Sequence, residues 1–200
     1  NYPMRSRPIW IMSQTDDVTV ESAMDVLLVL LYAQGSDGKV GEKIEGITRL
    51  EKLVYLLKKE TSLGQLIDST FKYDAYHYGP YSAEVVDNIE ALNELGLIRE
   101  TSRPMKSFVD ASDRYEVSSQ STDEPSLLEE DRTTETYELS DDGFKVAKVL
   151  FNSLIPQQQQ EVVRIKTKYN SLTLRQLLRY VYKEYPESTT ESQIKDYVFA

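Results

Sequence analysis

The chain has 200 residues, of which 40% are hydrophobic and 28% charged, a composition typical of a globular protein with enough residues for a real core. The lack of cysteine excludes disulfides and thiolate metal sites, and a single histidine leaves little material for a metal site or a catalytic triad. The longest apolar run, residues 26–33, is far shorter than the ~20 residues of a membrane-spanning helix. No secretory signal is visible, and the lack of cysteine suits a reducing compartment, so we expect a cytoplasmic protein. We also expect no cofactor.

The net charge of −10 is unevenly distributed along the chain. Residues 110–135 contain nine acidic and two basic residues, and the segment 118–134 has no hydrophobic periodicity, so we expect a flexible acidic loop there. Residues 161–185 contain six basic and two acidic residues, which makes the C-terminal third locally basic. Local patches of this kind, rather than the overall charge, decide whether a protein binds nucleic acid.

The first predicted element is an arm over residues 1–17, either vector-derived or disordered, with two prolines between basic residues. A helix is then predicted from about residue 20 to 34, with Thr19 as its N-cap and Gly35 as its stop. The middle of this helix is apolar on nearly every side, so we expect it to be central and buried.

A second helix is predicted to begin near Thr48, with one apolar face at the helical period and Lys52 outside that face. Residues 61–69 are expected to form a turn or a short irregular helix. Residues 71–78 alternate in the manner of a strand, and the Gly79-Pro80 pair is expected to end it in a turn.

The next helix carries the most consistent local signals in the chain. Ser82 suits its N-cap, and Gly96 suits the left-handed position that follows its last turn, with Leu97 reaching back to Leu92. Beyond it, short strands are expected around 97–99, 107–117 and 136–139, on either side of the acidic loop.

The C-terminal part is predicted to be helical. Ser140 is expected to cap a helix that ends before Pro156, and another helix is predicted over residues 157–169. Thr173 with Gln176, and Ser188 with Glu191, form two capping-box patterns, each of which predicts the start of a further helix.

The order of these elements predicts an α+β, mostly helical fold: a winged-helix-like domain over residues 18–155, followed by a C-terminal helical extension over 157–200. The reasons are the helix that ends at Gly96, the apolar pair that enters a hairpin, and the returning strand that runs into a capped helix. Any α+β domain with a hairpin is the alternative.

Five segments carry a resemblance to a known family: residues 50–57, residues 76–82 (Tyr-His-Tyr-Gly-Pro-Tyr-Ser), residues 95–98 (Leu-Gly-Leu-Ile), Tyr137 to Gly143, and residues 181–186 (Val-Tyr-Lys-Glu-Tyr-Pro). Together they resemble the Panacea domain of SocA-like antitoxins, and still more the YwgA-like proteins of bacteria and archaea. The resemblance covers most of residues 45–190. It implies a non-enzymatic regulatory or interaction module.

Tyrosines are the predicted protein-contact residues, because a tyrosine offers a large rigid surface with a polar tip. The candidates lie around the Gly-Pro pair and on the helix after Thr173, and the alternative for each is packing in the core. Either surface would also serve a homodimer. The candidates are Tyr76, Tyr78, Tyr81, Tyr182 and Tyr185.

Two polar features are interpreted as structural. His77 is expected to be hydrogen-bonded within the fold rather than to act as a base or sensor. The pair Asp141 and Asp142 is expected to stabilise the start of a helix rather than to bind a metal, and no metal site is predicted.

Binding of DNA in the usual winged-helix manner is disfavoured by charge. The helix in the recognition position has four acidic residues on its exposed side, Glu84, Asp87, Glu90 and Glu94, and the wing is the most acidic segment. If nucleic acid binds, the better candidates are basic residues of the C-terminal helices, whose alternative is an ordinary solvated face. They are Arg164, Lys166, Lys168, Arg175, Arg179 and Lys183.

The sequence therefore predicts a non-catalytic regulatory module that acts by protein–protein contact, antitoxin- or adaptor-like. The alternative is a transcriptional regulator that binds DNA through its C-terminal helices. No constellation of residues supports an enzyme.

Overall fold

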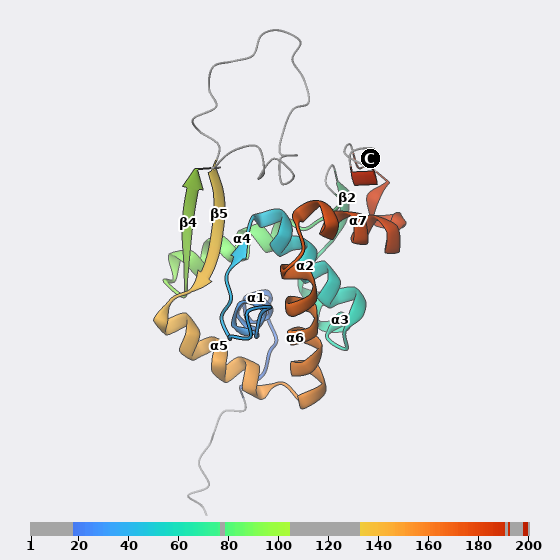
Figure 1. The fold of residues 1–200 in the computed structure, drawn as a ribbon. Coiled ribbons are helices and arrows are strands. Elements are labelled where there is room, and N and C mark those ends of the chain that lie inside the picture. Colours follow the sequence, from blue (N-terminus) through green and yellow to red (C-terminus); the bar gives the residue numbers. More distant parts are fainter. Residues whose placement is uncertain (1–17, 77–78, 105–132, 191, 193–197, 200) are drawn as a thin grey trace, which may run out of the picture.

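The computed structural model describes residues 18–76, 79–104, 133–190, 192 and 198–199 (Figure 1). It has the α+β, mostly helical architecture that was predicted, with two small antiparallel sheets. The elements are α1 (Ala23–Tyr32), β1 (Ile44–Glu45), α2 (Ile47–Glu60), α3 (Gly64–Thr70), β2 (Asp74–Tyr76), β3 (Gly79–Tyr81), α4 (Ala83–Glu94), β4 (Ile98–Pro104), β5 (Thr133–Leu139), α5 (Asp141–Ser153), α6 (Pro156–Asn170), α7 (Leu174–Glu184) and the 3-10 helix η3 (Pro186–Thr189).

The larger sheet has the strand order β1-β5-β4, and both pairings are antiparallel. Ile44 of β1 lies opposite Tyr137 of β5, and Ile98 of β4 lies opposite Leu139. These four side chains point to one face of the sheet because side chains alternate along a strand. Three of them are buried and Leu139 packs against the core, so this face closes the hydrophobic interior.

Helix α1 lies at the centre of the molecule, as its apolar sequence predicted. Every residue from Val26 to Tyr32 is buried. Figure 1 shows α5, α6 and the β4–β5 hairpin arranged around it, and α1 contacts all three as well as α4. Burial of each large apolar side chain contributes about 1.5–3 kcal/mol, so this helix anchors the core.

The start of α1 differs from the prediction. The N-cap is Ser22 rather than Thr19, and its hydroxyl accepts a hydrogen bond of 3.2 Å from the backbone N–H of Asp25. The carboxylate of Asp25 in turn accepts from the backbone N–H of Ser22 at 2.9 Å. This reciprocal pair satisfies two backbone donors at once, which outweighs the single bond that Thr19 would provide.

The Gly79-Pro80 pair does not end a strand, contrary to the prediction. It belongs to β3, which pairs antiparallel with β2 so that Ala75 lies opposite Pro80 and Tyr76 opposite Gly79. Among the described residues this sheet has only the strands β2 and β3, so β3 is an edge strand. Proline, which has no backbone N–H, is tolerated in an edge strand.

Both ends of α4 lie where predicted. At its C-terminus Gly96 has φ +70°, the N–H of Leu97 donates to the carbonyl of Leu92 at 3.0 Å, and the N–H of Gly96 donates to Asn93 at 2.9 Å, which is a Schellman motif. At its N-terminus Ser82 is the N-cap residue, but its hydroxyl donates to the carboxylate of Glu84 instead of accepting a backbone N–H.

The C-terminal helices pack on the elements that precede them. Helix α6 contacts both α1 and α2, and α7 contacts α2 and β3. The predicted capping box of Thr173 and Gln176 is present, and Ser140 caps α5 by accepting from the N–H of Gly143 at 3.0 Å. Ser188 lies inside η3, and its predicted partner Glu191 lies outside the described residues. In the described part of the chain, the helices are too short or too polar to cross a membrane.

Candidate functional site

Residues 79–82 of the Tyr-Gly-Pro-Tyr-Ser motif are held against the core by two contacts. Gly79 has φ +87°, and a Cβ atom there would lie 2.8 Å from Cε1 of Tyr182, so the backbone passes directly against that ring. The carbonyl oxygen of Pro80 accepts a hydrogen bond of 2.8 Å from Nζ of Lys52 on α2. Packing therefore accounts for the glycine and for the position of the β2–β3 hairpin.

The predicted contact tyrosines lie in different environments. Tyr182 is 2% exposed, so it is a core residue and not a contact surface, which corrects the prediction. Tyr185 is half-buried, with its ring edge-on to Tyr55 at 5.5 Å between centroids, so packing also accounts for it. Tyr81 is half-buried on β3. Tyr78 and the side chain of Tyr76 lie outside the described residues, as does His77.

A buried charged group lies beneath the hairpin. Lys52 is 1% exposed, and burial lowers the pKa of its amine although the neighbouring Glu51 carboxylate, 3.4 Å away, opposes that shift. Tyr73 donates from its hydroxyl to the backbone oxygen of Glu51 at 3.4 Å, and burial followed by the Glu51 charge raises the pKa of Tyr73 well above its usual value. An amine so enclosed presents no surface to a substrate, so Lys52 acts as a structural donor.

Three tyrosines and an arginine converge on the carboxylate of Glu60, the last residue of α2. Tyr180 donates to Oε1 at 2.8 Å, Tyr169 at 3.0 Å and Tyr185 at 3.2 Å, while Arg164 Nη1 lies 3.1 Å from Oε2. Burial acts to raise the pKa of Glu60, but these hydrogen bonds outweigh it and hold the pKa below its ordinary value. The cluster joins α2 to α6 and α7 and so holds the C-terminal helices against α2.

The predicted nucleic-acid residues differ in exposure. Lys166 is buried on α6, and its Nζ donates to the carbonyl of Leu31 in the last turn of α1 at 2.6 Å, so it is a core residue, contrary to the prediction. Burial lowers its pKa to about 7, against the opposing effect of the Glu42 and Asp37 charges. An interior amine of this kind cannot contact phosphates.

The other basic candidates lie nearer the surface. Arg164 is bound to Glu60, and Nζ of Lys168 lies 4.6 Å from the ring centroid of Tyr169, in cation–π contact. Arg179 donates from Nε to the carbonyl of Val198 at 2.9 Å. Lys183 is exposed and Arg175 is half-buried on α7. Most of these cations are therefore used within the fold.

Acidic side chains gather on α4 and the β4–β5 hairpin. Asp87, Glu90 and Glu94 are exposed on α4, as the sequence predicted, but Glu84 is half-buried and accepts a hydrogen bond from Ser82, contrary to the prediction. Glu100 of β4 is also exposed, and its pKa is raised by burial and by the charges of Glu135 on β5 and Glu90 on α4. Glu135 and Glu90 are therefore each close enough to act on the carboxylate of Glu100. We call α4 with Glu100 and Glu135 the acidic face.

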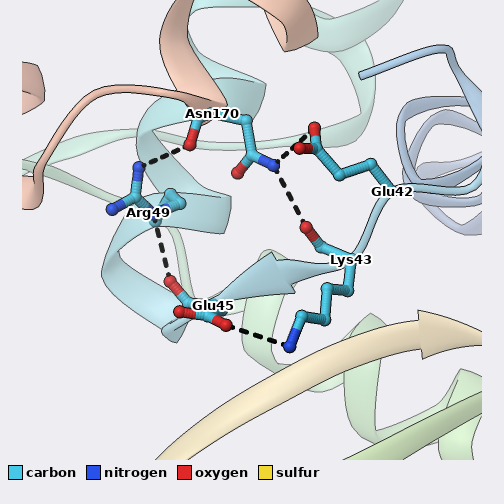
Figure 2. A pocket seen from close by; sticks show the side chains of 5 residues that line it. All are labelled: Glu42, Lys43, Glu45, Arg49 and Asn170. Carbon is cyan, nitrogen blue, oxygen red and sulfur yellow. Dashed lines mark hydrogen bonds and ion pairs between the residues drawn. The ribbon is translucent and has the colours of Figure 1, made fainter. Parts of the chain in front are cut away.

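A pocket of about 160 Å³ lies between the segment that leads into β1 and the C-terminus of α6 (Figure 2). Figure 2 shows Arg49 and Asn170 on one side of it and the chain from Glu42 to Glu45 on the other. It is lined by Glu42, Lys43, Glu45, Arg49 and Asn170. Sequence reasoning did not predict this site, because Asn170 is more than 100 positions from the other four residues and the set forms no recognised motif.

Arg49 builds the wall of this pocket. Its Nη1 donates to the carbonyl oxygens of Asn170 at 3.1 Å and Leu172 at 2.6 Å, and its Nε donates to that of Glu45 at 3.2 Å. A cation at the C-terminus of α6 is also favoured by the helix dipole. The guanidinium thus ties the start of α2 to the end of α6.

Metal chemistry finds no support in the described part of the chain, where no group of three or more His, Cys, Asp or Glu side chains is arranged to hold an ion. Asp141 and Asp142 lie at the start of α5, as predicted, and they form ion pairs with Arg99 at 3.2 Å and Lys145 at 2.8 Å. Their position and these partners account for both residues.

Comparison of the chain with protein-family models, with curated proteins and with solved structures gave no match. The resemblance to Panacea-domain and YwgA-like proteins therefore stays a prediction.

Proposed function

We propose that this protein is a non-catalytic regulatory module with a winged-helix-like fold, antitoxin- or adaptor-like, which binds a basic protein partner through the acidic face. The observation that carries the proposal is the crowding of like charges on that face, between α4 and the β4–β5 hairpin.

The order of the elements supports the winged-helix part of the proposal. A winged helix-turn-helix domain begins with a helix and a short strand, continues with further helices and ends in a hairpin. Its first strand lies beside the returning strand of the hairpin. Here that order is α1, β1, α2, α4, β4 and β5, with the sheet order β1-β5-β4. In that arrangement α4 is the helix that would enter the major groove.

The charges of that face oppose binding of DNA. Asp87, Glu90 and Glu94 would meet the phosphates of a duplex, and each carboxylate would be repelled by them. On β4, Arg99 and Arg103 are engaged by carboxylates, Arg99 by Asp141 and Arg103 by Glu45. A surface rich in lysine and arginine complements this face, because it relieves the mutual repulsion of the carboxylates.

Leu95 gives the same face an apolar contact. It is the residue that follows α4, and it is 63% exposed, next to Glu94. Protein interfaces commonly combine an apolar anchor with a charged rim that steers the partner. The face therefore has both features that a protein partner would use.

The proposal is tested by neutralising two carboxylates of α4 in the double variant Glu90→Gln, Glu94→Gln. The double variant Glu184→Gln, Glu187→Gln makes the same change of charge on α7 and η3 and serves as the control. We expect the wild type and the control to capture a basic partner from native lysate, with an affinity that falls as salt is added, and the α4 variant to lose it.

Two outcomes would contradict the proposal. One is capture of the same partner by the α4 variant as efficiently as by the control. The other is tight binding of duplex DNA at low salt that disappears when Arg175 and Arg179 are replaced by glutamate, which would favour a DNA-binding regulator that uses its C-terminal helices.

A further inference from the structure

The amide of Asn170 has a fixed orientation in the pocket of Figure 2. Its Nδ2 donates to Oε2 of Glu42 at 3.0 Å and to the carbonyl oxygen of Lys43 at 3.1 Å. The reversed amide would place an oxygen against two acceptors, so only this orientation satisfies the contacts. It leaves Oδ1 of Asn170 buried and without a hydrogen-bond donor among the described residues.

Glu42 is held in place by neutral donors. Its Oε1 accepts from the hydroxyl of Ser36 at 2.9 Å, and its Oε2 accepts from the backbone N–H of Ser36 at 3.2 Å as well as from Asn170. The side chain also lies directly over Gly35, where a Cβ atom would collide with it. Within the described ranges no ion pair includes Glu42, although its charge acts on the buried amine of Lys166.

The donors around the pocket are directed at other groups. Arg49 points its Nη1 and Nε at three carbonyl oxygens, and Lys43 pairs with Glu45 at 3.1 Å. Glu45 also receives Arg103. The acceptors that remain at the pocket are the charged carboxylate of Glu42 and the Oδ1 atom of Asn170. A ligand that matches them carries a positive charge and N–H donors.

The pocket has room for such a ligand. Its volume of about 160 Å³ is well above the ~10–15 Å³ that a single water requires. The side chains of Lys43 and Glu45 at its edge are 46% and 47% exposed, so the pocket opens to solvent.

We propose that this pocket binds a small organic molecule through its primary ammonium group, with Glu42 as the counter-ion and Asn170 Oδ1 as a hydrogen-bond acceptor. The binding site joins β1, the start of α2 and the end of α6, and it is separate from the acidic face. The proposal does not depend on the identity of the protein partner.

Methylammonium is the probe, and NMR of the ¹⁵N-labelled full chain is the measurement. We expect saturable shifts at the side-chain amide of Asn170 and at Nε of Arg49. A probe of two heavy atoms is limited to a Kd of roughly 6 mM or weaker. The variant Glu42→Gln should weaken binding at least about tenfold, while Glu187→Gln, which removes the same charge far from the pocket, should not change it.

Two comparisons on the wild type keep the test independent of the variants' folding. Tetramethylammonium has the charge without N–H donors and should bind more weakly than methylammonium, and acetate should produce no saturable shift. If tetramethylammonium bound as tightly as methylammonium, the proposed role of Asn170 Oδ1 as a hydrogen-bond acceptor would be wrong. Saturable binding of acetate, shifts with methylammonium that do not saturate, or unchanged affinity in Glu42→Gln would overturn the proposal.

Discussion

Replacing Glu60 by glutamine is expected to lower the free energy of unfolding by about 2 kcal/mol at pH 7. The carboxylate receives three phenol hydroxyls on Oε1 and the guanidinium of Arg164 on Oε2. Glutamine keeps one oxygen for the phenols but turns an NH₂ group toward Arg164, so the ion pair is lost and two donors face each other.

The magnitude follows from the strength of these bonds. A hydrogen bond to a charged group contributes about 1.5–3 kcal/mol and a neutral one about 0.5–1.5 kcal/mol, so each of the four bonds could lose ~1 kcal/mol. The sum is reduced because Tyr180 and Tyr185 are only half-buried and can turn to water, and because Arg164 is partly exposed. Tyr169 is fully buried and carries most of the loss.

The pH dependence gives an independent check. The folded-state pKa of Glu60 lies below its unfolded value, so its stabilising contribution is complete above the unfolded pKa of about 4.3 and is lost as the pH falls through the folded pKa. The difference in unfolding free energy between the wild type and Glu60→Gln should therefore be constant from pH 6 to 7 and should decrease below about pH 4.3.

Urea unfolding followed by circular dichroism measures both quantities. The control is Glu187→Gln, which removes a carboxylate 61% exposed beside Lys59 and should change stability by less than about 0.5 kcal/mol. A loss in Glu60→Gln no larger than that of the control, or a difference that does not decrease in acid, would refute the reasoning.

Three further substitutions are predicted to act through the backbone or through buried charge. Gly79→Ala should lower the free energy of unfolding, measured with urea, by about 1–3 kcal/mol, because φ is +87° and the new Cβ would lie 2.8 Å from the ring of Tyr182. Gly143→Ala should lower the free energy of unfolding by more than about 4 kcal/mol, because its Cβ would collide with the backbone oxygen of Leu97. Loss of cooperative thermal unfolding would show this effect. Lys166→Met should stabilise the protein at pH 6. Because the pKa of Lys166 is about 7 when folded and about 10.4 when unfolded, the wild type gains stability as the pH rises between those values, so the advantage of the variant, measured by urea unfolding, should narrow from pH 7 to 10.

The sequence predicted the elements whose signals are local. The Schellman ending at Gly96, the cap at Ser140 and the capping box at Thr173 each depend on residues within one helical turn, and all three are present. The predicted N-cap of α1 was wrong because two residues suited to capping, Thr19 and Ser22, lie within four positions of each other. The reciprocal bond with Asp25 decides between them.

The candidate sites were harder to predict because they depend on contacts between distant segments. Glu60 meets its tyrosines across more than 100 positions of the sequence, and the helical period alone does not indicate that meeting. The period also assigned Lys52 to the polar side of α2. That side is covered by the β2–β3 hairpin, so the lysine is enclosed and finds the carbonyl of Pro80 as its partner.

The buried cations share one role. Lys52, Lys166 and Arg49 each direct their N–H groups at backbone carbonyls of a distant segment: Pro80 on β3, Leu31 at the end of α1, and the end of α6. A buried carbonyl needs a donor, and a long cationic side chain can reach it across an interface between elements. Acidic residues are not suited to this role, because they offer no donor when ionised. These three cations are thus drawn inward, while three carboxylates of α4 stay at the surface. The surface that α4 presents is therefore complementary in charge to a basic protein and not to DNA.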